Sequence, residues 1–130
     1  VIECTDYTAD LIKIIEKISK TKTFTVLCGN IRRNTIPDYL QQNEIKYNEI
    51  TAYTTTLKPR LIKKNYEAVL FYSPSGVNSF LEHNSIEDKI CFCIGTTTAD
   101  ALENKTDKIV LASQPTIENV ITAVLNYYQR

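Results

Sequence analysis

The sequence predicts an α/β fold in which a parallel sheet carries helices on both faces. Three short apolar runs, V-L-F-Y, I-C-F-C-I and I-V-L-A, each lead into a stretch with helical periodicity. Parallel strands need a crossover connection, usually a helix, and strands that are covered on both faces form continuous apolar runs. The regular succession of strand, corner and helix therefore indicates parallel βα units.

The first part of the chain contains the same kinds of element. Residues 1–4 are expected to form a strand, and the apolar spacing within residues 7–20 predicts an amphipathic helix. Residues 24–28 are the next expected strand, and residues 32–42 and 46–53 follow as a short helix and a strand.

A linker is expected in the middle of the chain. The stretch 54–65 has no apolar run that could fill a core, and it contains three consecutive threonines, Pro59 and four basic residues. We place the linker at about residues 51–60, between a first domain of residues 1–53 and a second of residues 54–130. The second domain is expected to contain strand–helix pairs at residues 67–72 and 74–82, 89–94 and 97–104, and 108–112 and 116–128.

The strands of the second domain are expected to be buried on both faces. On this expectation Leu70→Ala would open a cavity and cost about 2–5 kcal/mol of folding free energy. The last helix has a stripe of apolar residues that is expected to pack on the sheet: Ile117, Val120, Ile121, Val124 and Leu125.

Charge and hydropathy limit the partners. Fifteen basic and fifteen acidic residues cancel, so no whole-molecule field would attract nucleic acid or a membrane surface. No run approaches the roughly 18 apolar residues of a membrane span, and the N-terminus lacks a signal-peptide pattern. We expect a cytoplasmic protein with neither nucleic acid nor membrane as a partner.

Four cysteines, Cys4, Cys28, Cys91 and Cys93, fall in or beside expected strands. A zinc site, the alternative, would usually have C-x2-C and further ligands, whereas the single histidine, His83, lies in a polar loop. We therefore expect reduced thiols in core or half-buried positions, and no metal.

Corners rich in hydroxyl groups recur where strands meet helices. Four are present, at residues 28–30, 73–76, 95–98 and 113–116. Each alone is explained by helix N-capping. Three consecutive corners at the carboxyl edge of one sheet would instead bind a polyanion, through hydroxyl and backbone N–H donors. No nucleotide-binding glycine motif and no Ser/His/Asp set is present, so this pattern alone predicts no reaction.

Five motifs in order resemble uroporphyrinogen-III synthase. They are C-G-N-I-R-R at residues 28–33, T-A-Y at 51–53, F-Y-S-P-S-G-V at 71–77, I-G-T-T-T-A-D-A-L at 94–102 and A-S-Q-P-T-I-E-N-V at 112–120. That family has two α/β domains joined by a two-stranded linker, and its chains are roughly twice this length. The resemblance implies that this chain corresponds to the C-terminal half. Residues 1–53 would end the domain formed by the middle of the full chain, and residues 54–130 would form most of the other.

The resemblance also implies an activity without a cofactor. Hydroxymethylbilane loses water, its last ring is inverted, and the macrocycle closes as uroporphyrinogen III. The substrate carries eight carboxylates, which corners on both sides of a cleft would hold. The expected partners are this substrate and either the missing N-terminal half or a second copy of the chain. The 130 residues alone are expected to be inactive because one wall of the cleft would be incomplete.

By the resemblance, Tyr53 is the catalytic residue, with its hydroxyl near the departing hydroxyl group of the substrate. The alternative for Tyr53 is a strand-end aromatic that packs on the sheet. Arg33 matches the basic position after C-G-N and, with Asn30, is expected to bind substrate; an exposed Arg in a first helical turn is more often only solvated.

Two corners of the second domain are also assigned to substrate binding by the resemblance. Their residues are Ser73, Ser75 and Gly76 in the first corner, and Thr97 and Thr98 in the second. The sequence departs from the family at Thr96, where Pro or Lys is common.

Two alternatives to the enzyme stay open. One is a flavodoxin-like domain that binds anions and has no catalytic activity, and the other is a truncated, inactive paralogue. A phosphate-receiving domain would need acidic residues at the strand ends, and none is placed there.

Overall fold

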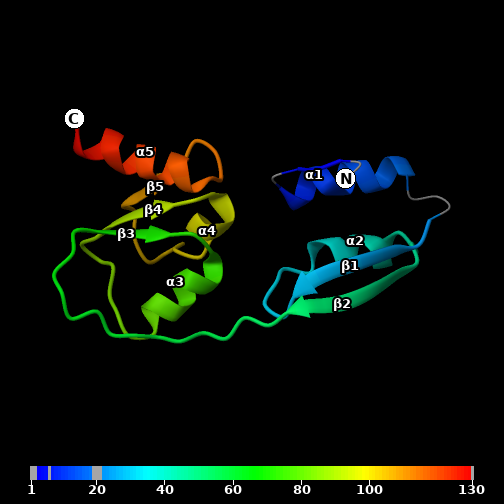
Figure 1. Cartoon of the computed structure of the whole chain (residues 1–130), viewed down its shortest axis with the longest axis horizontal. Helices are drawn as coiled ribbons and strands as arrows, with labels where there is room; N and C mark the ends of the chain where they lie inside the picture. Colours follow the sequence, from blue (N-terminus) through cyan, green and yellow to red (C-terminus); the bar gives the residue numbers. More distant parts are fainter. Residues whose placement is uncertain (1–2, 6, 19–21, 130) are drawn as a thin grey trace. The chain divides into compact units, whose positions relative to one another are not determined.

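The structure, a computed structural model, describes residues 3–5, 7–18 and 22–129. It divides into two compact units, Val1–Thr56 and Leu57–Arg130. Each unit combines a parallel sheet with helices (Figure 1). The α/β class predicted from the sequence is confirmed.

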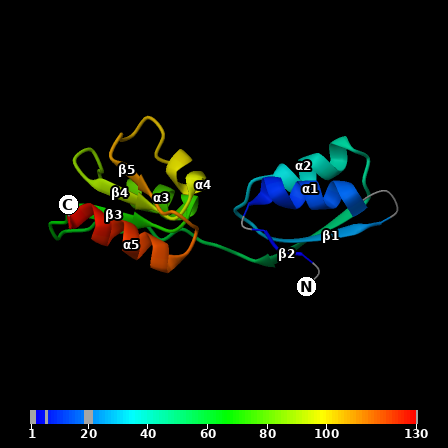
Figure 2. The ribbon, with the colours of Figure 1, turned by 90° about the horizontal axis from the view of Figure 1, so that it is seen from above.

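The first unit contains a two-stranded parallel sheet. Strand β1 (Phe24–Gly29) pairs with β2 (Tyr47–Tyr53), and the helices are α1 (Thr8–Ile18) and α2 (Thr35–Gln42). Both helices lie on the same side of the sheet (Figure 2). On the opposite side Leu27 and Ile50, which are partners in the register, are exposed to solvent.

The start of the chain differs from the sequence prediction. Of the strand expected at residues 1–4, Val1 and Ile2 lie outside the described residues, and Glu3 and Cys4 are not in a strand. Cys4 is exposed rather than buried, because no sheet forms around it there.

The second unit contains a three-stranded parallel sheet in the order β3-β4-β5. Its elements are β3 (Ala68–Phe71), α3 (Pro74–Leu81), β4 (Ile90–Cys93), α4 (Thr96–Asp100), β5 (Ile109–Leu111) and α5 (Ile117–Tyr128). Helices α3 and α5 lie on opposite faces of this sheet (Figure 1). Helix α4 ends at Asp100 instead of the expected residue 104, and the chain continues in turns.

Strand β4 forms the centre of the second unit. Cys91 and Cys93 are fully buried in the core on the α3 side, with Phe71, Val77 and Leu102. Because strand side chains alternate, Phe92 points to the other face. There its ring meets the rings of Tyr127 and Tyr128, with centroid separations of 5.7 and 6.5 Å.

One expectation about burial is wrong, that for Leu70, and one holds in part: α5 packs on the sheet, but with only part of its apolar stripe. Leu70 is 37% exposed, because α5 packs against β4 and β5 and leaves the corresponding side of β3 open. Val120 is the fully buried member of the apolar stripe of α5, whereas Ile117, Ile121 and Leu125 are exposed. The stripe is wider than the strip of sheet that the helix covers.

Candidate functional site

The corner after β1 is shaped by an irregularity in the pairing of the two strands. Cys28 is opposite Thr51, but Gly29 is opposite Tyr53, so Ala52 is an extra residue in β2. Such a bulge re-aims the side chains that follow it. Tyr53 therefore points to the face of the sheet that carries Leu27, away from α1 and α2.

The ring of Tyr53 lies directly on Gly29. A Cβ atom at residue 29 would be 2.6 Å from Cε2 of Tyr53, 2.7 Å from Cζ and 3.0 Å from the hydroxyl oxygen. Tyr53 is nevertheless 64% exposed. The strand-end packing considered for Tyr53 thus involves the hydroxyl end of the ring against Gly29, while most of the residue stays exposed to solvent.

Asn30 lies beside Tyr53, and its side chain forms hydrogen bonds to Thr55, two residues after Tyr53. Its Nδ2 donates to the carbonyl oxygen of Thr55 at 3.1 Å, and its Oδ1 accepts from the Thr55 N–H at 2.6 Å. The Asn30 N–H donates to the carbonyl oxygen of Tyr53 at 3.3 Å. The side-chain amide is therefore used within the unit.

A polar cluster next to this corner was not singled out by the sequence. Arg32 donates to Glu49 and Asn34, and its Nε is 3.1 Å from Sγ of Cys28. The hydrogen bond to Glu49 is the main cause that raises the pKa of Arg32. Arg33, the residue predicted from the sequence, is exposed just before α2. The pair of adjacent arginines in C-G-N-I-R-R was the available signal, and it could not tell which arginine bonds Cys28 and Glu49.

The corner after β3 forms a capped helix N-terminus. Ser73 is the N-cap of α3, and its Oγ accepts from the Gly76 N–H at 3.1 Å. The hydroxyls of Ser73 and Ser75 are also 3.1 Å apart. Pro74 has no N–H, so Ser75 supplies the first-turn N–H that has no helical acceptor. Gly76 is exposed at the same turn.

The corner after β4 presents its threonines differently from the expectation. Gly95 is the N-cap of α4. Thr98 is only 3% exposed, Thr97 is half-buried and Thr96 is exposed. Thr96, which departs from the family pattern, is therefore the most exposed of the three threonines.

The corner after β5 is accounted for by capping. Oγ1 of Thr116 accepts from the Asn119 N–H at 3.3 Å and from its Nδ2 at 2.8 Å, and Ser113 donates to Oδ1 of Asn119 at 2.7 Å. These hydroxyls and the Asn119 amide bond one another and close the first turn of α5.

The structure places the predicted residues in two groups. Tyr53, Asn30 and Arg33 belong to the first unit. Ser73, Ser75, Gly76, Thr97 and Thr98 follow β3 and β4, which are neighbours in one parallel sheet, so their corners are at the same edge of that sheet.

The thiols of β4 are protonated core groups. Burial raises the pKa of Cys91 and, together with the neighbouring Cys91, raises that of Cys93 to about 12. Within residues 3–5, 7–18 and 22–129, no three His, Cys, Asp or Glu side chains are grouped so that they could hold a metal ion.

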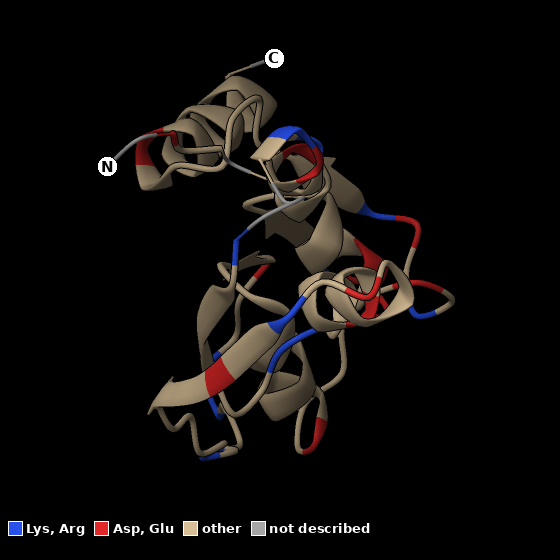
Figure 3. Ribbon diagram, turned by 90° about the vertical axis from the view of Figure 1, so that its right-hand side faces the viewer, with Lys and Arg blue, Asp and Glu red and all other residues tan. Residues whose placement is uncertain are grey.

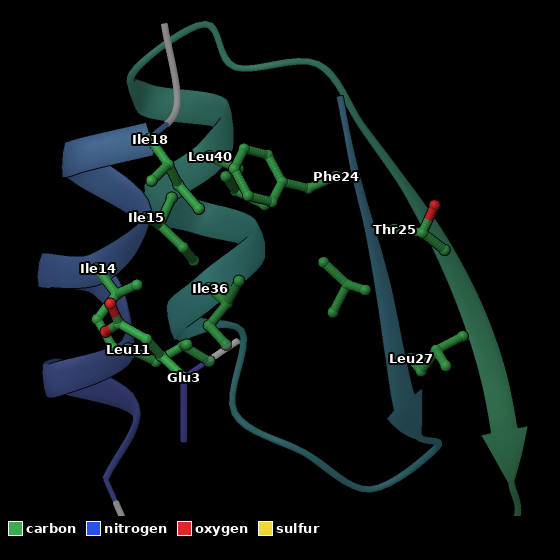
Figure 4. A pocket seen from close by; sticks show the side chains of 11 residues that line it. Glu3, Leu11, Ile14, Ile15, Ile18, Phe24, Thr25, Leu27, Ile36 and Leu40 are labelled. Carbon is green, nitrogen blue, oxygen red and sulfur yellow. The ribbon is translucent and has the colours of Figure 1, made fainter. Parts of the chain in front are cut away.

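A cavity of about 410 Å³ in the first unit lies between α1, α2 and β1 (Figure 4). Its walls are mainly aliphatic and include Leu11, Ile15, Ile36 and Leu40. Such a lining does not suit a carboxylate-rich ligand, because charged groups buried without partners are strongly disfavoured.

Charge is mixed rather than segregated. Basic and acidic residues both occur in each unit (Figure 3). Among the helices in the described part of the chain, none has the length and apolar character needed to cross a membrane.

Comparison with known proteins decides the family. The family model described as uroporphyrinogen-III synthase HemD matches residues 1–122. The chain belongs to this family. The match includes the motifs at residues 28–33, 51–53, 71–77, 94–102 and 112–120, so the resemblance noted in the sequence is confirmed.

Two further proteins are similar to this chain. It is 24% identical over 123 residues to the porphyrin biosynthesis protein HemD of Ruminiclostridium josui, an alignment that covers 86% of this chain and 24% of that protein. The crystal structure of uroporphyrinogen-III synthetase from Helicobacter pylori 26695 matches with a TM-score of 0.71 and 20% identity. That match covers 90% of this chain and 59% of the other, and it shows a shared fold. The chain thus spans only part of the length of both relatives.

Proposed function

We propose that this chain is part of a uroporphyrinogen-III synthase, which converts hydroxymethylbilane into uroporphyrinogen III during haem biosynthesis. The observation that carries the proposal is the match of the family model to residues 1–122. It is supported by the position of the family's tyrosine, Tyr53, which is exposed at the end of β2.

Tyr53 is proposed as the catalytic residue. Its phenol is accessible, and a hydroxyl can donate a hydrogen bond to the hydroxyl group that leaves the substrate. Loss of that group leaves a cation stabilised by the pyrrole, so positioning and electrostatic support account for most of the catalysis. No covalent intermediate with the protein is needed.

The corners after β3 and β4 are proposed to bind substrate carboxylates. Ser73, Ser75 and Gly76 begin α3, where the first-turn N–H groups and the positive end of the helix dipole favour an anion. At the second corner Thr97 is proposed as the donor. The hydroxyl of Thr98 is buried, so its predicted contact with substrate would require the backbone N–H or a movement of the corner.

Arg33 is proposed as an accessory contact for a carboxylate, because it is exposed just before α2. The proposed activity belongs to the complete protein, in which the remaining partner is either further sequence of the same protein or a second copy of this chain. We further propose that the protein acts in the cytoplasm.

The isomer of the product tests this function. Hydroxymethylbilane closes spontaneously to the type I isomer only, so the type III isomer reports the enzyme. The complete protein is incubated with hydroxymethylbilane, and the products are oxidised and separated by chromatography. We expect the type III isomer in excess over a reaction without protein. The type I isomer alone would instead favour the anion-binding domain or the inactive paralogue.

A further inference from the structure

We propose that Gly29 and Asn30 are positioning residues for Tyr53. Gly29 provides the surface on which the phenol ring lies, and Asn30 fixes the backbone at Tyr53 and at Thr55, directly after the ring. This inference rests on the proposed function, in which Tyr53 acts on the substrate.

The bulge gives Tyr53 its direction. Without the bulge, strict alternation along β2 would place Tyr53 on the same face as Thr51 and Glu49. With it, Tyr53 is opposite Gly29 and on the other face. A bulge is a local irregularity, so the backbone after it needs further contacts to stay in one conformation.

Gly29 leaves room for the ring in that direction. Any side chain at residue 29 would place its Cβ within 2.6–3.0 Å of Cε2, Cζ and the hydroxyl oxygen of Tyr53, and the ring would have to move. The backbone of Gly29 does not require glycine, because its φ angle is not positive. The close approach of Tyr53 is therefore the structural reason for glycine at this position.

Asn30 fixes the chain around Tyr53. Its N–H bonds the Tyr53 carbonyl oxygen, and its side-chain amide bonds both the N–H and the carbonyl oxygen of Thr55. The pair of side-chain bonds imitates one more step of strand pairing beyond the end of β2. Because the amide donates and accepts within the unit, this arrangement favours a positioning role over the substrate contact predicted from the sequence.

The position of the ring can be measured directly. In the complete protein, 3-fluorotyrosine incorporated at residue 53 reports the surroundings of the ring through its ¹⁹F resonance. We expect Gly29→Ala and Asn30→Ala to shift or broaden this resonance, and Asn30→Asp, which keeps the acceptor for the Thr55 N–H, to have a smaller effect. Asn43→Ala is the matched control: it removes another exposed bond from an Asn side chain to backbone, Nδ2 to the Tyr39 carbonyl oxygen, and should leave the resonance unchanged.

Enzyme kinetics distinguish a role of Gly29 and Asn30 in positioning Tyr53 from a general loss of folded structure. A misplaced catalytic group lowers kcat, and we expect a loss of about tenfold to a hundredfold in Gly29→Ala and Asn30→Ala, with KM little changed. In a Tyr53→Phe background both substitutions should have little further effect, because they act through the missing hydroxyl. Asn43→Ala should keep the activity of the unmodified protein.

Two results would overturn the inference. One is a ¹⁹F resonance that does not change in either Gly29→Ala or Asn30→Ala. The other is a loss of kcat that is equally large in the Tyr53→Phe background. If the unmodified protein forms no type III isomer, the proposed function fails, and the ¹⁹F resonance alone still decides whether Gly29 and Asn30 position the ring.

Discussion

Tyr53 combines exposure with a fixed environment, which is what a catalytic group on a protein surface requires. The hydroxyl end of its ring lies on Gly29, and its own carbonyl oxygen accepts from the Asn30 N–H. The sequence could identify this residue through T-A-Y. It could not predict the bulge that aims the ring, because the extra residue becomes visible only when β1 and β2 are paired.

Tyr53→Phe tests the role of the hydroxyl. We expect kcat of the complete protein to fall by about tenfold to a hundredfold, the effect of losing one hydrogen bond to a developing charge. Stability should hardly change, because the side chain is 64% exposed. Steady-state formation of the type III isomer and thermal unfolding measure the two quantities. Unchanged turnover would remove Tyr53 from the site.

Because of Cys93, the free energy of unfolding should decrease as the pH rises above about 8. The pKa of this thiol is raised to about 12 in the folded protein, mainly by burial, and is about 8.5 in an unfolded chain. A thiol with a raised pKa contributes stability that is present below the unfolded value and is lost as pH rises towards the folded value. Between pH 8 and pH 10 the free energy of unfolding should therefore fall by about 1–2 kcal/mol.

Urea denaturation at the two pH values measures this loss. Cys93→Ala should reduce the pH dependence and leave the smaller part that comes from Cys91, whose pKa is also raised by burial. An equal pH dependence in Cys93→Ala would show that other groups cause it.

At the scale of elements, local signals predicted most of the secondary structure. Pro74 after Ser73 predicts the start of α3, which the structure confirms, and the apolar run predicts β3, which ends at Phe71, one residue before the expected end. Such capping and periodicity signals are contained within a few residues.

Side-chain direction and coverage were harder to predict. Thr98 is buried because α4 is a single short turn against the core, and the sequence T-T-T does not show which hydroxyl points inward. Leu70 is partly exposed because α5 covers the neighbouring strands instead. Both depend on tertiary packing, which a local pattern does not contain.

Replacing leucine with alanine at residue 102 and at residue 70 tests which face of the sheet is covered by packing. Leu102 is fully buried against Phe71 and Val77, whereas Leu70 is 37% exposed on β3. We expect Leu102→Ala to cost about 2–5 kcal/mol and Leu70→Ala about 1 kcal/mol. Chemical denaturation of both variants measures the difference. Equal losses would mean that the open side of β3 is covered in solution.

At the scale of the whole molecule, the family could be predicted from the sequence, because five motifs of the family occur in order along the chain. The family model that matches residues 1–122 confirms it. The division at Thr56 and Leu57 describes two compact parts. The assignment of each part to a particular domain of the full-length enzyme stays a prediction, as do the roles of the individual site residues.

The central claim is that hydroxyl and N–H donors at the start of α3 hold the carboxylates of a tetrapyrrole. A crystal structure of the complete protein with uroporphyrinogen III bound tests it most directly. The account predicts a carboxylate within hydrogen-bond distance of the N–H or the hydroxyl of Ser75, in the corner where Ser73 caps the Gly76 N–H. A tetrapyrrole bound elsewhere, with this corner in contact only with water, would contradict it.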